Sequence, residues 1–331
     1  MSHIHQLGER RVIEIIMDHL DEMPEMPIPF WDDVSAVDLG GGRLAILKTD
    51  MLVWSTDIPP GMTHYQAGRK AMVMNISDLA AKGVRPMAVL VSLGLPRDLQ
   101  GEEVAEIARG MNDGARDYGA YVLGGDTNEA GEIIISGMAF GIAEEGKIMR
   151  RDGARPGDIL ATTGVFGKTA AGLKILLEGL EAPADLRSSL VEAVFMPKAR
   201  VEEGVALAES GVVTASMDSS DGLALSLYDL SRSSGVGFRV DRLPAAPEAR
   251  RFAELHGLKL SDLVLYGGEE YELVFTVKPE GVEEARRVLR RVGGELIVIG
   301  EVTEEKEILY RVNGELRPIR PGGWEHFKGG A

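Results

Sequence analysis

The sequence predicts a chain of two domains, each of which combines helices and strands in an α/β or α+β arrangement. Its 331 residues exceed the length of one ordinary domain. Apolar segments of strand length alternate with segments of helical periodicity in both halves. Between the halves, the stretch 150–158 (RRDGARPGD) has the Gly, Pro and charge content of a linker. We therefore expect domains at residues 1–149 and 150–331.

The first half begins with a helix, a loop and a pair of strands. Residues 4–20 alternate apolar and charged side chains at helical spacing, which predicts an amphipathic helix. Residues 21–31 are rich in Met and Pro and predict an extended loop. The segments 34–39 and 43–53 are strand-like and flank the glycines 40–42, which favour a turn.

The remainder of the first half predicts two helices and three strands. The first helix, 64–82, is expected to end at Gly83, a residue type that favours helix ends, with Pro86 just beyond. The segments that follow are the strand 87–96, the helix 101–118 and the strands 120–127 and 132–144.

The second half repeats the alternation of strands and helices. The expected strands are 158–164, 212–218, 235–240, 271–277 and 295–302, and the expected helices are 167–180, 198–210, 221–234 and 281–292.

The composition limits the classes of function. Hydrophobic residues make up 44% and charged residues 27%, which suits a globular protein with a sizeable core. No run reaches the roughly 18 to 20 apolar residues of a membrane helix, and no apolar region follows the charged start as in a signal peptide. We expect a cytoplasmic protein without a membrane partner. The formal net charge of −16 argues against nucleic-acid binding.

The chain contains no cysteine, which excludes disulfides, thiolate nucleophiles and sulfur-ligated metals. Its six histidines include no HExxH pair. A bound metal would therefore have oxygen ligands, as Mg²⁺, Mn²⁺ or Ca²⁺ does. Divalent cations between carboxylates and phosphates are also the main way in which so acidic a chain can hold a polyphosphate.

Aspartates recur where predicted strands begin or end, which is where α/β folds build sites. A single such residue is more often a helix cap or a turn residue. Four groups in the same kind of position favour a shared metal site instead. The groups are Asp32 with Asp33, Asp50 after Thr49, Asp126 after two glycines, and Asp218 with Asp221 around Ser219 and Ser220.

Asp78 lies in a helix that is apolar on several sides, three residues after Asn75. A buried carboxylate is costly unless it is paired or binds a metal. The alternatives are a metal ligand and a buried ion pair with Lys82, one turn further along the helix.

Two glycine-containing segments suggest phosphate binding with different strength. Gly124 and Gly125 would let backbone N–H groups approach an anion, although such a pair is usually only a turn. The run TTGVFGKT at 162–169 is no Walker A motif, because Thr162 stands where that motif needs glycine. Its helix start could still meet a phosphate, and helix packing explains the glycines equally well.

Two later segments carry polar and aromatic candidates. In YGGEEYEL (266–273), a strand would place Glu270 and Glu272 on one face and Glu269 on the other. In PGGWEHF (321–327), Trp324 could fill a core or stack on a flat heteroaromatic ligand. The pattern as a whole favours metal-assisted transfer between two bound ligands over covalent catalysis.

Eight segments, in this order, resemble the thiamine-monophosphate kinase family of the aminoimidazole-ribonucleotide-synthetase-like superfamily. NISDLAAKG, GGDT, DSSDGL and GGEEYEL are specific in combination, and the resemblance covers almost the whole chain. The segments are WDDVSAVDL, LKTDMLV, NISDLAAKGVRPMAVLVSLGLP, VLGGDT, RRDGARPGD, SMDSSDGL, YGGEEYELVFT and GGWEHF.

The resemblance implies an N-terminal domain whose sheet pairs with that of a second subunit, a C-terminal α+β domain, and an active site in the cleft between them. It implies ATP-dependent phosphorylation of thiamine monophosphate to thiamine diphosphate by direct in-line transfer with several Mg²⁺ ions. The partners would be these small molecules and a second copy of the chain.

The same resemblance implies roles for individual residues. Asp32 is a weaker candidate for the metal site, and the sequence does not decide between Arg150 and the adjacent Arg151. The implied metal ligands are Asp33, Thr49, Asp50, Asp78, Asp126, Asp218 and Asp221; the implied ATP contacts are Gly125, Asp126, Arg151 and Ser220; and the implied substrate contacts are Asp57, Glu269 and Trp324.

The chain departs from the family pattern at two positions. Bacterial relatives read TDTLVEGVHF where this chain reads TDMLVWSTDIPPG, so Asp57 stands where they have histidine. Trp324 replaces a tyrosine that is common there, and tryptophan stacks at least as well.

Other functions stay open on the sequence alone. One is another ATP-dependent enzyme of the superfamily, such as aminoimidazole ribonucleotide synthetase. Selenophosphate synthetase and the hydrogenase maturation protein usually carry a cysteine or selenocysteine, which this chain lacks. The other is a nucleotide- or metal-binding protein without turnover.

Overall fold

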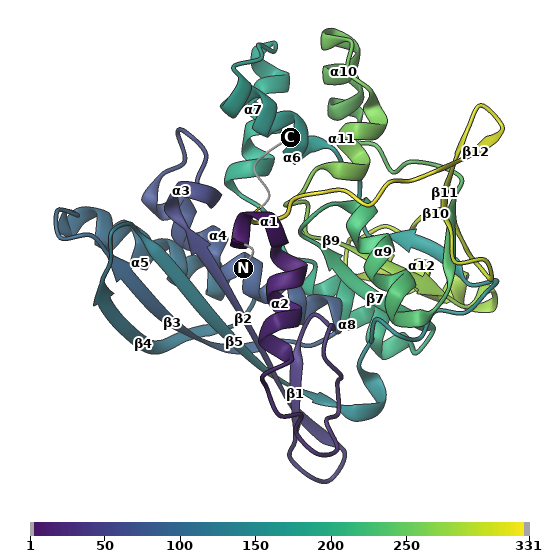
Figure 1. Cartoon of the computed structure of the whole chain (residues 1–331), viewed down its shortest axis with the longest axis horizontal. Coiled ribbons are helices and arrows are strands. Elements are labelled where there is room, and N and C mark those ends of the chain that lie inside the picture. The colour runs from purple at the N-terminus through teal and green to yellow at the C-terminus, as the bar shows by residue number, and fades with distance from the viewer. Residues whose placement is uncertain (1–2, 328–331) are drawn as a thin grey trace.

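The structure is a computed structural model, and it describes residues 3–327. The first domain is built on a five-stranded sheet in the order β1-β2-β5-β3-β4, in which only β3 and β4 are parallel neighbours (Figure 1). Its strands are β1 (Ser35–Asp38), β2 (Arg43–Val53), β3 (Pro86–Leu95), β4 (Tyr121–Glu129) and β5 (Ile134–Glu144).

Two helices cover one face of this sheet, and the other face carries exposed apolar side chains. The covering helices are α4 (His64–Ala81) and α5 (Gly101–Arg116), and a short helix α3 (Trp54–Asp57) follows β2. The core between α4 and the sheet includes Ile46, Ile76 and Ile135, all fully buried. On the uncovered face, Met51, Leu90 and Leu123 are 55%, 43% and 70% exposed.

The second domain is built on a seven-stranded sheet in the order β12-β11-β8-β10-β6-β9-β7. Only β11 and β8 pair in parallel. Its strands are β6 (Ile159–Thr162), β7 (Val213–Ser219), β8 (Gly237–Val240), β9 (Glu272–Val277), β10 (Ile297–Thr303), β11 (Ile308–Val312) and β12 (Glu315–Pro318).

Helices surround the second sheet and also form a separate small core above it (Figure 1). That small core joins α6, α7, α10 and α11 through residues such as Leu190, Phe252 and Leu263. The helices are α6 (Lys168–Glu178), α7 (Ala184–Phe195), α8 (Val201–Ser210), α9 (Leu223–Ser234), α10 (Pro247–His256), α11 (Leu260–Tyr266) and α12 (Val282–Arg291).

Helix α4 also packs against the second domain and so forms the boundary between the two halves. It contacts α8 so closely that a Cβ atom on Gly204 would lie 1.9 Å from the carbonyl oxygen of Ala80. Only glycine fits at that position. The two sheets are joined by the segment 145–158, which contains residue 150, where the sequence places the domain boundary.

The element predictions were incomplete in identifiable places. The helix expected at 4–20 is two helices, α1 (Ile4–Leu7) and α2 (Glu9–Met17), because Gly8 adopts φ 73° and ψ 165° between them. Helices α7, α10 and α11 and strands β11 and β12 have no counterpart in the prediction. No helix within residues 3–327 is long and apolar enough to cross a membrane.

Candidate active site

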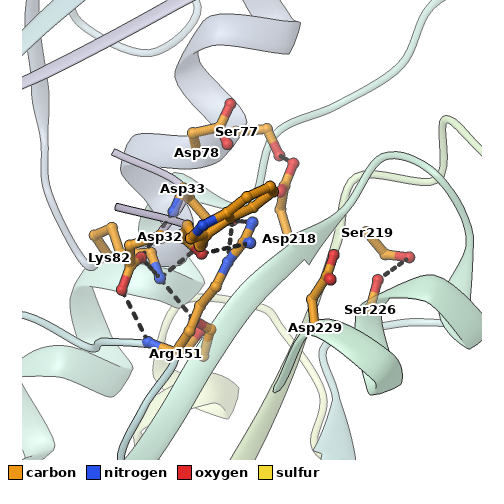
Figure 2. Close-up of polar contacts among 12 residues, drawn as sticks. Asp32, Asp33, Ser77, Asp78, Lys82, Arg151, Asp218, Ser219, Ser226 and Asp229 are labelled. Carbon is orange, nitrogen blue, oxygen red and sulfur yellow. Dashed lines mark hydrogen bonds and ion pairs between the residues drawn. The ribbon is translucent and has the colours of Figure 1, made fainter. Parts of the chain in front are cut away.

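Three buried aspartates from different parts of the chain meet between the two domains (Figure 2). Asp33 follows the Pro-rich loop, Asp78 lies on α4, and Asp218 lies near the end of β7. One carboxylate oxygen of each lies within 4.8 Å of the other two. Ser77, beside Asp78 on α4, donates a hydrogen bond of 2.7 Å to Asp218 Oδ2. Two domains therefore contribute to one acidic cluster.

Burial and mutual repulsion make two of these carboxyl groups weak acids. Burial, together with the charge of Asp33, raises the pKa of Asp218 to about 6. Burial also raises the pKa of Asp78 well above its ordinary value, with a further contribution from Asp218. Asp33 is different: burial opposes its ionisation, but the charges of Arg151 and Lys82 hold its pKa below the ordinary value. The cluster thus contains more carboxylate than its own cations neutralise.

Lys82 and Arg151 fix the part of the cluster that comes from the Pro-rich loop (Figure 2). The fully buried Lys82 Nζ lies 2.6 Å from Asp32 Oδ1 and 2.6 Å from Asp33 Oδ2. It also donates to the carbonyl oxygen of Ser216 at 2.7 Å. Arg151 pairs with Asp33 and donates to the carbonyl oxygen of Trp31. Arg150 instead pairs with the exposed Asp152, so Arg151 is the one of the two arginines at the site.

Strand β2 adds a lysine and a fourth aspartate to the cluster. Lys48 and Asp50 are two residues apart, so their side chains lie on the same face of the strand. Lys48 Nζ lies 3.2 Å from Asp50 Oδ1 and 3.3 Å from Asp78 Oδ1. Asn75 holds the strand in place by accepting from the Asp50 N–H at 2.9 Å.

The donor set fits a hard divalent cation. The close group offers carboxylate oxygens only, and hard cations such as Mg²⁺ prefer oxygen ligands. The raised pKa of the buried Asp218 and Asp78 shows that a further positive charge would be favourable there. Asp33, Asp50, Asp78 and Asp218 are therefore the residues best placed to hold such an ion.

Thr49 and Asp126 lie on the opposite face of the sheet from this cluster. Residues directly across neighbouring strands share a face. One row of residues crosses the four strands β4, β3, β5 and β2. It consists of Asp126, Ser92, Ser136 and the exposed Met51. Thr49, two residues before Met51, shares that face, and its hydroxyl donates to the carbonyl oxygen of Gly137. Asp50, between them, faces α4 instead.

The loops after β7 and before β9 hold one another by backbone hydrogen bonds. Glu269 N and Tyr271 N donate to the carbonyl oxygens of Ser220 and Ser219. Glu269 and Tyr271 have φ of 64° and 52°, which is unusual for residues other than glycine. The pairing keeps the segment of Ser220 and Asp221 next to that of Glu269.

The three residues expected to contact a second substrate are linked to this region. The buried Lys70 of α4 forms an ion pair with Glu269 and donates to the carbonyl oxygen of Asp57 at 2.8 Å. The Asp57 carboxylate itself accepts from Val53 N at 2.7 Å. Trp324 N donates to the carbonyl oxygen of Asp221 at 3.0 Å, and the Trp324 side chain is 51% exposed. An exposed aromatic ring and two acidic residues thus lie at the same end of the site.

The start of α6 is not available to a phosphate. Glu270 Oε1 accepts hydrogen bonds from the backbone N–H groups of Gly167 and Thr169, which a bound anion would need. The placement of Glu270 and Glu272 on one strand face was also wrong. Strand β9 begins only at Glu272, which pairs with Arg200, because the backbone at 269–271 is not extended.

Of the two alternatives for Asp78, the ion pair with Lys82 does not form, since Lys82 pairs with Asp32 and Asp33 and Asp78 pairs with Lys48. Sequence reasoning also missed Lys48, Lys70 and Ser77. The signal for Lys70 was a charged residue inside a helix that is apolar on nearly every side. Lys48 gave no such signal, because a lysine on an amphipathic strand is common.

Comparison with known proteins assigns both halves of the chain. Residues 31–143 match the family model for the AIR synthase related protein, N-terminal domain, and residues 155–312 match the model for its C-terminal domain. A thiamine-monophosphate kinase of Pyrococcus horikoshii is 36% identical over 326 residues, which cover 98% of each chain. One of Nitrosopumilus maritimus is 38% identical over 283 residues, which cover 86% of this chain and 89% of that protein.

Among solved structures, one described as AaThiL complexed with AMPPCP and TMP superposes with a TM-score of 0.86. It is 29% identical, and the match covers 98% of this chain and 99% of that chain.

Proposed function

This chain belongs to the thiamine-monophosphate kinase family, and from that premise we propose how it uses ATP to phosphorylate thiamine monophosphate. The observation that carries the activity is full-length similarity to these kinases, including a structure with AMPPCP, an ATP analogue, and TMP. The buried acidic cluster between the domains supplies the chemical reason for a phosphoryl-transfer site.

The transfer is direct. A phosphate oxygen of thiamine monophosphate forms a bond to the γ-phosphorus of ATP while the bond from that phosphorus to the β–γ bridging oxygen breaks. The products are thiamine diphosphate and ADP. No nucleophilic side chain is needed in such a direct transfer, and the chain has no cysteine that could serve as one.

Mg²⁺ at this site would neutralise charge on the phosphates of both substrates. Asp33, Asp50, Asp78 and Asp218 would hold the ions at the cluster, and Asp221 would hold one beside it. Thr49 and Asp126 stay proposed metal ligands on the family resemblance alone, and they would hold a separate ion, because they lie on the other face of the sheet from the cluster. Asp32 is the weaker candidate in this proposal: its carboxylate joins Lys82 to the backbone N–H of Arg151, and Asp33 rather than Asp32 belongs to the close group of carboxylates.

On the ATP side, we assign contacts to Arg151, Ser220, Gly125 and Asp126. Arg151 supports this role because its guanidinium group is held at the edge of the cluster by Asp33. Ser220 lies two residues after Asp218 and is exposed, so its hydroxyl is free to meet a phosphate oxygen. Gly125 and Asp126 extend the proposed site along β4.

On the acceptor side, we assign Glu269, Asp57 and Trp324 to thiamine monophosphate. The exposed Trp324 ring offers a surface on which a flat heteroaromatic ring can stack. Glu269 and the carbonyl oxygen of Asp57 share the ammonium group of Lys70, which sets their separation. The Asp57 carboxylate already accepts a hydrogen bond from Val53 N, so the backbone of Asp57 is the part best placed to contact thiamine monophosphate.

We also propose that the chain forms a homodimer through the uncovered face of the first sheet. Isolated exposed apolar residues are ordinary, but several on one sheet face indicate a contact surface. The strand registers place Met51, Leu90 and Tyr121 on that face in three neighbouring rows, and each is at least 43% exposed. A domain boundary at residue 150 and a cytoplasmic location stay predictions of the sequence.

The function is tested by incubating the purified chain with ATP and thiamine monophosphate, with and without Mg²⁺, and measuring thiamine diphosphate. We expect product only when metal is present. Formylglycinamidine ribonucleotide, the acceptor of the related synthetase, should give none.

Activity with formylglycinamidine ribonucleotide, together with no activity with thiamine monophosphate, would overturn the assignment. ATP binding without any product would show a protein that binds nucleotide without turnover. Equal activity after chelation of all divalent cations would remove the metal role from the acidic cluster.

A further inference from the structure

In the part of the chain that the structure describes, three cationic side chains, Lys48, Lys82 and Arg151, reach the acidic cluster, and the last two are held rigidly. Lys82 has three acceptors for its three N–H bonds, and its side chain is fully buried. Arg151 is 14% exposed and divides its donors between Asp33 and the carbonyl oxygen of Trp31. Neither can leave without uncovering a buried carboxylate.

Lys48 is held much more loosely than these two. Its Nζ lies 3.2 and 3.3 Å from its carboxylate partners, against 2.6 Å for both carboxylate partners of Lys82. Its side chain is 21% exposed. Within residues 3–327, no backbone carbonyl accepts a hydrogen bond from its ammonium group. Its ammonium group therefore has two close partners, Asp50 and Asp78, while the charges of Asp218 and Asp33 act on it from further away.

The position of Lys48 is also the position that a metal ion would need. Its ammonium group lies between one carboxylate oxygen of Asp50 and one of Asp78. An ion bound by both carboxylates would lie about 2 Å from each oxygen and would occupy the same space. An ammonium group and a divalent cation in that space repel one another.

We propose that Lys48 is an internal competitor of the divalent cation: its ammonium group neutralises Asp50 and Asp78 in the metal-free protein and must leave them before metal binds. The proposal rests on the proposed metal site. The four-carbon side chain of Lys48 is partly exposed, so it can turn away without breaking a hydrogen bond to the backbone. Lys82, the other lysine of the cluster, cannot be exchanged in this way.

This role has a consequence for the order of binding. Metal alone must displace an attached cation, whereas metal that arrives with phosphates brings a new acceptor for the displaced ammonium group. Lys48 therefore biases the site toward metal that enters together with a nucleotide.

The test measures Mn²⁺ binding to the full chain without nucleotide, by the electron paramagnetic resonance signal of the free ion. Lys48→Met keeps the length of the side chain and removes the charge, so we expect Mn²⁺ to bind at least about tenfold more tightly than to the wild type. Lys48→Arg keeps the charge and should bind Mn²⁺ as the wild type does. Lys174→Met, at an exposed ion pair on α6, should change nothing.

If folded Lys48→Met bound Mn²⁺ no more tightly than the wild type does, the proposal would be overturned. Lack of Mn²⁺ binding to both proteins would overturn it together with the metal site. The two proposals can also fail separately. If Lys48→Met bound Mn²⁺ more tightly but the wild type did not phosphorylate thiamine monophosphate, the inference would be supported and the proposed function would fail.

A measurement on the wild type covers the case in which Lys48→Met does not fold. Acylation of lysine amines, read by mass spectrometry, should modify Lys48 faster when Mn²⁺ is added, because the metal releases its ammonium group from the carboxylates. Lys82 should stay unmodified in both conditions. Unchanged or slower modification of Lys48 on addition of Mn²⁺ would contradict the displacement.

Discussion

Lys82 is the lysine of the acidic cluster on which we expect stability to depend most. Lys82 binds two carboxylates and a carbonyl oxygen from three segments that are far apart in sequence. A buried ion pair of this kind adds little by itself, but the loss of one partner leaves the others uncompensated. Lys82 is thus a structural residue of the site.

We expect Lys82→Met to lower the free energy of unfolding by about 3 to 5 kcal/mol, because two buried carboxylates lose their cation. Urea unfolding in the presence of a chelator measures the change without help from metal. Lys147→Met serves as the control, since it removes an exposed ion pair with Glu144 and should leave the unfolding midpoint where it is. Equal midpoints for Lys82→Met and the wild type would show that the three contacts contribute nothing.

At this scale, sequence reasoning located the acids better than the bases. Asp50 and Asp218 were recognisable because each follows a run of strand-like residues, a local pattern, although only Asp218 lies near the end of its strand and Asp50 lies inside β2. The partners of Lys48, Lys70 and Lys82 depend on which distant segments meet, and no local pattern encodes that. The same limit is why an ion pair of Asp78 with Lys82 stayed open as an alternative.

Among the elements, the start of α6 and the strained segment 269–271 form one unit. Glu270 accepts from two N–H groups at the helix start, and Thr169 Oγ1 donates to the carbonyl oxygen of Gly268 at 2.6 Å. Burial raises the pKa of Glu270 to about 7, although these hydrogen bonds favour the carboxylate. The helix start is thus held by an acid that ionises with difficulty.

The raised pKa makes stability depend on pH in a defined direction. Between pH 4.5, the ordinary value, and about 7, the folded protein holds a proton on Glu270 that the unfolded chain has lost. The free energy of unfolding therefore falls as pH rises through this window. Glu270→Gln keeps an acceptor oxygen and removes the titration. Relative to the variant, we expect the wild type to lose up to about 3 kcal/mol between pH 5 and 8.

Chemical unfolding at several pH values provides this comparison. Glu284→Gln, on the surface of α12, is the control, because the Glu284 pKa is lowered by Arg287 and its titration lies below the window. Parallel pH profiles for the wild type and Glu270→Gln would show that Glu270 titrates normally.

The helices and strands with a long, regular hydrophobic pattern were predicted, and several of those with a weak pattern were not. Strand β2 and helix α4 have long regular patterns, and both occur with bounds close to those expected. Strands β11 and β12 are short, β11 is mostly half-buried and β12 is exposed, so their hydrophobic pattern is weak. The break at Gly8 depends on one backbone angle, and helical periodicity continues across it.

For the whole molecule, the uncovered sheet face predicts the oligomeric state. We expect the wild type to have twice the chain mass of 35.7 kDa in light scattering. Leu90→Asp with Leu123→Asp places two charges on the apolar face and should yield monomers. Leu255→Asp, a 54% exposed leucine on α10, should leave the mass unchanged. A wild type that has the mass of one chain would remove the dimer.

Helix α4 limits how the two domains can move. Lys70, Ser77 and Lys82 bond to Glu269, Asp218 and Ser216 of the second domain, at three levels that span about 18 Å of helix. A hinge opens by rotating about one line, and three attachments spread along a rod would all have to stretch together. We therefore expect substrates to meet side chains that α4 already holds in place across the domain boundary, so that fit and charge distinguish them without a large rotation of one domain against the other.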